Sequence, residues 1–203
     1  MTRVAAIDCG TNSIRLLVAD VVEGRLTDLV REMRVVRLGQ GVDRTGQFAE
    51  EALVRTFAAL DDYAATCREL GVERVRFVAT SATRDASNRD VFLDGVRERI
   101  GVTPEVISGH EEASLSFSGV VSAVSDAPAP FLVVDLGGGS TELALGAGEL
   151  DAAYSMDVGC VRITERHLTA NPPTATQQAD AVADVRAALA VATAAYVGLQ
   201  RRN

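Results

Sequence analysis

The first part of the chain holds short apolar runs bounded by polar residues, which is the pattern of buried or half-buried strands. The runs are interrupted near residues 10–13 and again at Gly24, where tight turns are expected. We therefore predict three strands, over residues 3–9, 14–22 and 24–39.

From Glu50 to Leu70 the apolar residues change to a helical period, with spacings of 4, 3, 4 and 3. Gly71 follows at the position expected of a C-cap glycine, so the segment predicts one amphipathic helix. Its apolar face consists of Leu53, Phe57, Leu60, Ala64 and Cys67.

Shorter strand and helix patterns alternate as far as residue 124. Residues 125–130, SDAPAP, then interrupt the pattern with two prolines, and a new strand pair begins at Phe131. We predict an α/β fold of two related lobes with mixed sheets, residues 1–126 and 127–203. The expected elements are strands at 74–80 and 104–108, a helix at 88–100 ended by Gly101, a helix from Glu111, a third strand near 151–158, and an Ala-rich helix over 174–198.

Composition narrows the class of protein. The chain has 203 residues and is 47% hydrophobic, enough for a substantial core, and no apolar run approaches the length of a membrane span. Its N-terminus enters a strand pattern without a secretory segment, so we expect a cytoplasmic location and no membrane partner. Cys9, Cys67 and Cys160 fit neither a disulfide framework nor a CxxC metal site.

The net charge of −8 argues against nucleic acid as a partner, because an acidic surface repels a polyanion and DNA binding is not expected. All 20 basic residues are arginines. A phosphate ligand would therefore depend on local groups: backbone N–H donors, a few arginines and a metal ion.

Two similar turns supply such groups. Each begins with an aspartate at the end of a strand, Asp8 or Asp135, and continues with glycine and hydroxyl residues. Glycines let backbone N–H groups point inward around an anion, and an aspartate can hold a divalent ion opposite it. One such turn is equally well explained as a glycine-rich hairpin, but its repetition favours phosphate binding. The candidate phosphate-binding residues are Gly10, Thr11, Asn12, Ser13, Gly137, Gly138, Gly139, Ser140 and Thr141.

Five segments in order resemble the signatures of the exopolyphosphatase and guanosine pentaphosphate phosphohydrolase family. That family belongs to the actin, sugar-kinase and Hsp70 superfamily, so the resemblance implies a ribonuclease H-like, actin-type ATPase fold of two lobes. The segments are DCGTNSIRLLVAD (8–20), TSATRDASN (80–88), VISGHEEASLSFSGV (106–120), DLGGGSTEL (135–143) and VGCVRITERHL (158–168).

The resemblance implies roles for individual residues. Glu112 matches the general base that activates water, and Arg84 matches an arginine that clamps phosphate. Asp135 and Glu142 match an acidic pair associated with the metal, Mg²⁺ or another divalent cation, and Asp8 matches the aspartate of the first turn. A monovalent cation and a homodimer are compatible with it. On residues alone, Glu112 also suits an ordinary acidic helix turn, and the alternation around Glu142 also allows a solvated side chain.

Three further residues have simpler interpretations. We expect His110 in an exposed loop, His167 on a helix surface and Cys9 as a small buried side chain.

The implied reaction is release of terminal phosphate from inorganic polyphosphate, with guanosine pentaphosphate as the alternative substrate. A sugar or acetate kinase is more remote, because it is not expected to carry both TSATR and SGHEEA. A non-hydrolytic actin-type nucleotide-binding protein is also more remote, because the full hydrolase set, including Glu112, weighs against it. Family members continue into a strand, here expected from Tyr196, and a further glycine-rich turn. The chain ends before that turn, so we expect an incomplete second lobe and slow hydrolysis.

Overall fold

The computed structural model describes residues 1–124 and 128–200, with side chains as far as residue 196. The chain forms two compact units, Met1–Ile107 and Ser108–Asn203. The division lies earlier than the lobe boundary expected at residues 126 and 127. Helix α5 (Gly109–Ala123) falls in the second unit because it packs on the strands of that unit.

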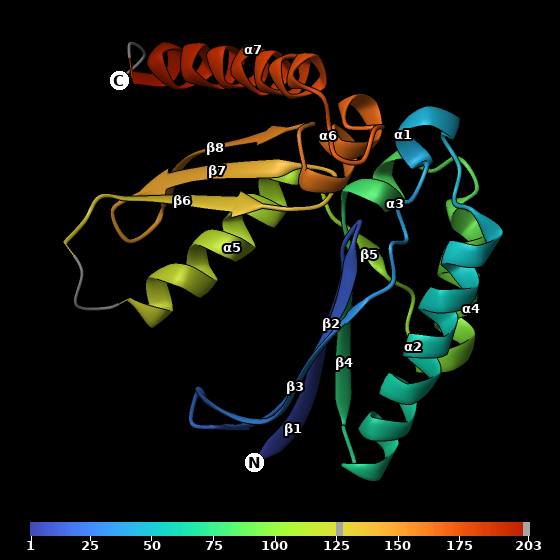
Figure 1. Cartoon of the computed structure of the whole chain (residues 1–203). Coiled ribbons are helices and arrows are strands. Elements are labelled where there is room, and N and C mark those ends of the chain that lie inside the picture. The colour runs from blue at the N-terminus through green and yellow to red at the C-terminus, as the bar shows by residue number, and fades with distance from the viewer. Residues whose placement is uncertain (125–127, 201–203) are drawn as a thin grey trace. The chain divides into compact units, whose positions relative to one another are not determined.

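The first unit is built on a five-stranded sheet of order β3-β2-β1-β4-β5. The first three strands are antiparallel, and β4 and β5 join parallel to β1 and β4. Helices α2 and α4 lie on one face of this sheet (Figure 1). The elements are β1 (Thr2–Cys9), β2 (Ser13–Val22), β3 (Arg25–Val35), α1 (Val42–Thr45), α2 (Glu50–Glu69), β4 (Arg74–Ala79), α3 (Ser81–Asp85), α4 (Arg89–Ile100) and β5 (Glu105–Val106).

These elements confirm the predicted strands and helices of the first unit, while α1 and α3 were not predicted. Gly71 and Gly101 both follow their helices with a positive φ, as C-cap glycines do. One core fills the space between sheet and helices, and Phe92 packs edge-on against Phe48 and Phe77 within it. The buried side chains of β1 and the apolar face of α2 therefore pack in the same core between sheet and helices.

Tyr63 on α2 is fully buried and donates its hydroxyl hydrogen bond to the carbonyl of Ile14 on β2, over 3.1 Å. Tyr63→Phe should lower the free energy of unfolding by about 1 kcal/mol, because it leaves a buried carbonyl without that donor. Urea unfolding measures the effect as a lower midpoint at constant slope. An unchanged midpoint would show that the bond contributes nothing to stability.

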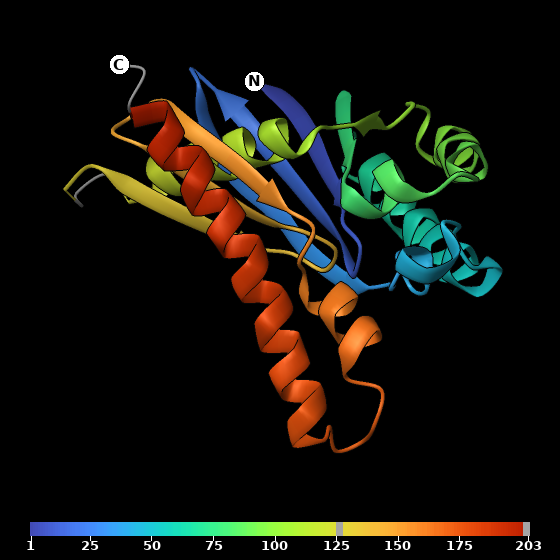
Figure 2. The same ribbon diagram turned by 90° about the horizontal axis from the view of Figure 1, so that it is seen from above.

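The second unit is a three-layer arrangement around a three-stranded antiparallel sheet of order β6-β7-β8. Helix α5 lies on one face of this sheet and α7 on the other (Figure 1). Seen from above, α7 runs across β8 (Figure 2). Besides α5, the elements are β6 (Phe131–Leu136), β7 (Thr141–Gly146), β8 (Leu150–Met156), α6 (Cys160–His167) and α7 (Ala175–Gln200).

The end of α7 corrects one prediction. Tyr196 lies inside α7 and not at the start of a strand, and its hydroxyl donates to the carbonyl of Leu143 over 2.6 Å. That contact fixes the C-terminal part of the helix on the sheet. Among the described residues, no helix is both long enough and apolar enough to cross a bilayer.

His167 also differs from its expected place. It lies in the last turn of α6, but its Nε2 is 2.9 Å from Asp184 Oδ2 on α7, so it joins two helices and does not simply face solvent. Cys9 is buried and His110 is exposed, as predicted, but His110 lies in the first turn of α5 and not in a loop.

Candidate active site

The two glycine-rich turns are closed by the same hydrogen bond. In the first unit, the N–H of Gly10 donates to the carbonyl of Ser13 over 2.9 Å. In the second unit, the N–H of Gly137 donates to the carbonyl of Ser140 over 3.0 Å. The repetition seen in the sequence is therefore a repetition of backbone structure.

The beginning of α6 holds the second turn in place. The N–H groups of Cys160 and Val161 donate to the carbonyls of Gly137 and Gly138, over 3.0 and 2.9 Å. These bonds turn two carbonyls toward α6. Among the residues that the structure describes, the N–H groups of Gly138 and Gly139 have no backbone acceptor, so both are available to an anion.

The hydroxyl groups of the second turn are less available than the sequence suggested. Thr141 donates its hydroxyl hydrogen bond to the carbonyl of Val158, which leaves no proton for phosphate. Ser140 is buried, with 2% of its surface exposed. The backbone N–H groups are therefore the more available donors of this turn for an anion.

The first turn is held by the segment after β3. The carbonyl of Thr11 accepts from the N–H of Gly39 over 2.8 Å, and the carbonyl of Asn12 accepts from Val36 and Arg37. Gly39 is close to Thr11: a Cβ at Gly39 would lie 2.3 Å from the Thr11 methyl group. Within the described part of the chain, Thr11 Oγ1 is buried and makes no hydrogen bond, so its proton is uncommitted.

Asp8 is the last residue but one of β1, just before this turn, and is opposite Arg15 in the β1–β2 pair. Arg15 Nη1 lies 3.2 Å from Asp8 Oδ2, with 63% and 39% of the two side chains exposed. Arg15 is a candidate site residue that sequence reasoning missed, although its place opposite Asp8 follows from the turn length. The adjacent Cys9 is not a ligand candidate, because burial raises the pKa of its thiol and keeps it protonated.

Arg84 lies in α3, directly after the strand that pairs with β1. Its Nη1 donates to the carbonyl of Ile107 over 2.9 Å, so the guanidinium is fixed at one end. The first unit thus provides Asp8, Arg84 and the first turn.

The second unit provides the three remaining acidic candidates. Glu112 lies in the first turn of α5, where its N–H donates to the carbonyl of Ser108, the N-cap residue, over 2.9 Å. A carboxylate at this position is stabilised as an anion by the helix dipole. Gly109 allows this turn to approach β8, because a Cβ there would lie 2.4 Å from the Cβ of Ser155.

Asp135 and Glu142 are directly opposite each other in the β6–β7 pair, on the sheet face that α5 covers. Ser116 on α5 donates to Asp135 Oδ2, and Ser155 on β8 donates to Glu142 Oε1 over 2.7 Å. Only 1% of Glu142 is exposed, so the alternative of a solvated side chain is wrong.

The carboxylate oxygens of Asp135 and Glu142 suit a hard divalent cation that takes few protein ligands. Among the described residues, no group of three or more His, Cys, Asp or Glu side chains is arranged to hold a metal. Asp135 has an oxygen, Oδ1, without a hydrogen bond to the described part of the chain. Two carboxylates with water and phosphate oxygens are the ligands that Mg²⁺ commonly takes.

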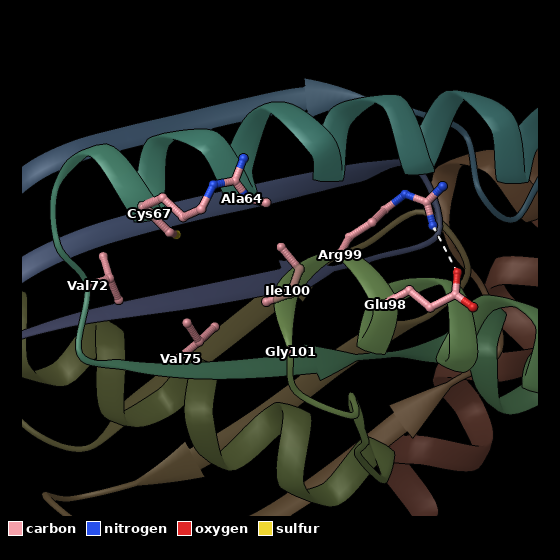
Figure 3. A pocket seen from close by; sticks show the side chains of 9 residues that line it. Ala64, Cys67, Val72, Val75, Glu98, Arg99, Ile100 and Gly101 are labelled. Carbon is pink, nitrogen blue, oxygen red and sulfur yellow. Dashed lines mark ion pairs between the residues drawn. The ribbon is translucent and has the colours of Figure 1, made fainter.

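A groove of about 310 Å³ lies elsewhere in the first unit, between the C-terminal ends of α2 and α4. Figure 3 shows Cys67 and Val75 at this groove, with Ile100 beside them. Val75 pairs with Ala5 near the start of the parallel strands, whereas the first turn follows their other end. The groove is therefore separate from the first glycine-rich turn.

Comparison with known proteins decides the family. The model of the Ppx/GppA phosphatase family matches residues 17–198. The chain belongs to that family. Exopolyphosphatase 2 of Mycobacterium tuberculosis is 58% identical over 183 residues, which cover 86% of this chain and 57% of that protein. Guanosine-5'-triphosphate,3'-diphosphate pyrophosphatase of Vibrio atlanticus is 35% identical over 196 residues, which cover 96% of this chain and 39% of that protein.

Crystal structures of the Ppx/GppA family share the fold. An exopolyphosphatase-like protein has a TM-score of 0.90 at 52% identity, over 93% of this chain and 60% of that one. An exopolyphosphatase from Cytophaga hutchinsonii has a TM-score of 0.82 at 34% identity, over 88% of this chain and 57% of that one. The predicted fold class is thereby confirmed. The chain spans 57% of the mycobacterial exopolyphosphatase 2 and 57–60% of these two structures.

Proposed function

We propose that this Ppx/GppA chain carries the catalytic carboxylates of a phosphohydrolase that releases terminal phosphate from inorganic polyphosphate. The proposal rests on the groups that the second unit brings together at its glycine-rich turn. Its Gly138 and Gly139 offer N–H groups to an anion, and Asp135 and Glu142 flank that same turn. The identity of 58% to a protein named exopolyphosphatase supports polyphosphate as the substrate.

In this reaction Glu112 accepts a proton from the attacking water, because it is a half-buried carboxylate on the helix that packs beside Asp135. Asp135 and Glu142 hold the divalent cation, Mg²⁺ or a similar ion, which offsets phosphate charge and polarises water when bound. Asp8 acts with them from the first turn, as the resemblance implies. Arg84 stabilises charge on the transferring phosphoryl group.

Phosphate release from polyphosphate, guanosine pentaphosphate and ATP, each with and without Mg²⁺, tests this proposal. Because the chain spans 57% of its mycobacterial relative, slow turnover is expected and the protein should be in excess over substrate. Mg²⁺-dependent release from polyphosphate before ATP supports the proposal. ATP as the preferred substrate would contradict it and favour a kinase-like or actin-like activity.

Guanosine pentaphosphate hydrolysis is the second candidate. It is favoured by the identity of 35% to the Vibrio atlanticus protein, which covers 96% of this chain. The same assay separates the two, because faster release from guanosine pentaphosphate than from polyphosphate would reverse their order. A homodimer and a cytoplasmic location stay predictions.

Arg84→Ala should weaken binding of short polyphosphate and slow its hydrolysis together, each by about 10-fold, since a clamp contacts both the ground state and the transition state. Calorimetric titration and single-turnover release measure the two effects. Arg97→Ala is the matched control, because Arg97 is exposed near the C-terminal end of α4 and pairs with Asp94. Loss of turnover without loss of affinity would instead assign Arg84 to the transition state alone.

A further inference from the structure

Helix α5 presents two polar side chains one turn apart on the same face. Glu112 and Ser116 are four residues apart, and both are half-buried, beside the buried pair Ala113 and Phe117. Side chains at this spacing are neighbours, with about 5–6 Å between Cβ atoms. The bond that Ser116 makes therefore lies on the same helix face as Glu112, one turn away.

Ser116 is fixed by Asp135. Its hydroxyl donates to Asp135 Oδ2, across from α5 to the end of β6. This bond occupies one carboxylate oxygen and restrains the orientation of the carboxylate. Asp135 Oδ1 makes no hydrogen bond to the described residues and is the oxygen left for a cation.

We infer that Ser116 is a positioning residue that sets the geometry between Asp135 and Glu112. The inference rests on the proposed function, because it assigns Asp135 to the cation and Glu112 to the water. A hydroxyl at residue 116 ties the base-carrying helix to the metal-binding strand within one compact unit. Removing it leaves Asp135 Oδ2 without this donor and so loosens the orientation of the carboxylate.

The same helix supplies a matched control. Ser118 is exposed, and its hydroxyl donates to the carbonyl of Ser114 on its own helix, over 2.9 Å. Ser118→Ala makes the same chemical change as Ser116→Ala without touching the sheet. Ser116→Thr keeps the hydroxyl group and tests whether that group is responsible.

The experiment titrates Mn²⁺ into the wild-type chain and the three variants, with the free ion measured by electron paramagnetic resonance. Ser116→Ala should weaken Mn²⁺ binding by about 10-fold, as loss of an outer-shell partner commonly does. Ser118→Ala should bind like wild type, and Ser116→Thr should recover most of the affinity. Near-ultraviolet circular dichroism confirms that each variant is folded, and single-turnover phosphate release is followed in parallel.

Equal Mn²⁺ affinity in wild type and Ser116→Ala would overturn the inference, as would failure of Ser116→Thr to restore a lost affinity. Phosphate release by a wild-type chain that binds no Mn²⁺ would also overturn it, since Asp135 would then hold no cation. The first two outcomes leave the proposed function standing, whereas phosphate release without Mn²⁺ binding would also contradict the cation role proposed there for Asp135 and Glu142. A folded wild-type chain that neither binds Mn²⁺ nor releases phosphate would overturn the proposed function and the inference together.

Discussion

Glu112→Gln should slow phosphate release by about 10²- to 10⁴-fold while leaving affinity for short polyphosphate nearly unchanged. Glutamine keeps the size of the side chain but cannot accept the proton of the attacking water. The base acts on water and not on the phosphate chain, so the ground-state complex should persist. Single-turnover release with the protein in excess measures the rate, and calorimetric titration measures the affinity.

Glu111→Gln is the matched control for this variant. Glu111 is the neighbouring carboxylate in the same first turn of α5, but it is exposed whereas Glu112 is half-buried. The control removes the same charge from the same helix end and should retain most of the wild-type rate. A wild-type rate in Glu112→Gln, or an equal loss in both variants, would remove Glu112 from the role of base.

The elements with one buried face were predictable from the sequence because burial alone sets their period. In β1, Ala5, Ile7 and Cys9 face the core, and in α2 the predicted face is the one that packs on the sheet. The short helix α3 was missed because five residues do not show a helical period. The division into compact units after Ile107 was not predictable in the same way, because the prolines at 128 and 130 interrupt the sequence pattern without marking where packing changes.

The sequence indicated which residues belong to the candidate site, but not which contacts those residues make. The glycines and aspartates of both turns are recognisable locally, since the turn and the strand end lie within a few residues. Ser116 and Ser155 donate to carboxylates 19 and 13 residues away, through packing that the local pattern does not record. Burial of Glu142 has the same origin, because β7 alternates but both of its faces are covered.

Gly159→Ala should abolish most of the phosphate affinity of the second turn, with a loss of about 100-fold. Gly159 precedes α6, and a Cβ there would lie 2.4 Å from the carbonyl carbon and oxygen of Gly138 and 2.6 Å from the nitrogen of Gly139. These are backbone atoms, so no side chain can rotate away and either the turn or α6 must move. A displacement of about 1 Å is enough to cost about 10²-fold in a positioned site.

The backbone conformation of Gly159 is compatible with alanine, so this substitution tests a single effect. Its φ of −134° is extended and open to any residue, so alanine introduces only the collision and no torsional strain. Gly119→Ala in α5 is the matched control, because a Cβ there meets nothing within 4 Å. That control should bind phosphate like wild type and gain about 0.5–1 kcal/mol of stability from helix propensity. Calorimetric titration with short polyphosphate compares the two variants, and wild-type affinity in folded Gly159→Ala would show that the second turn does not bind the phosphate chain.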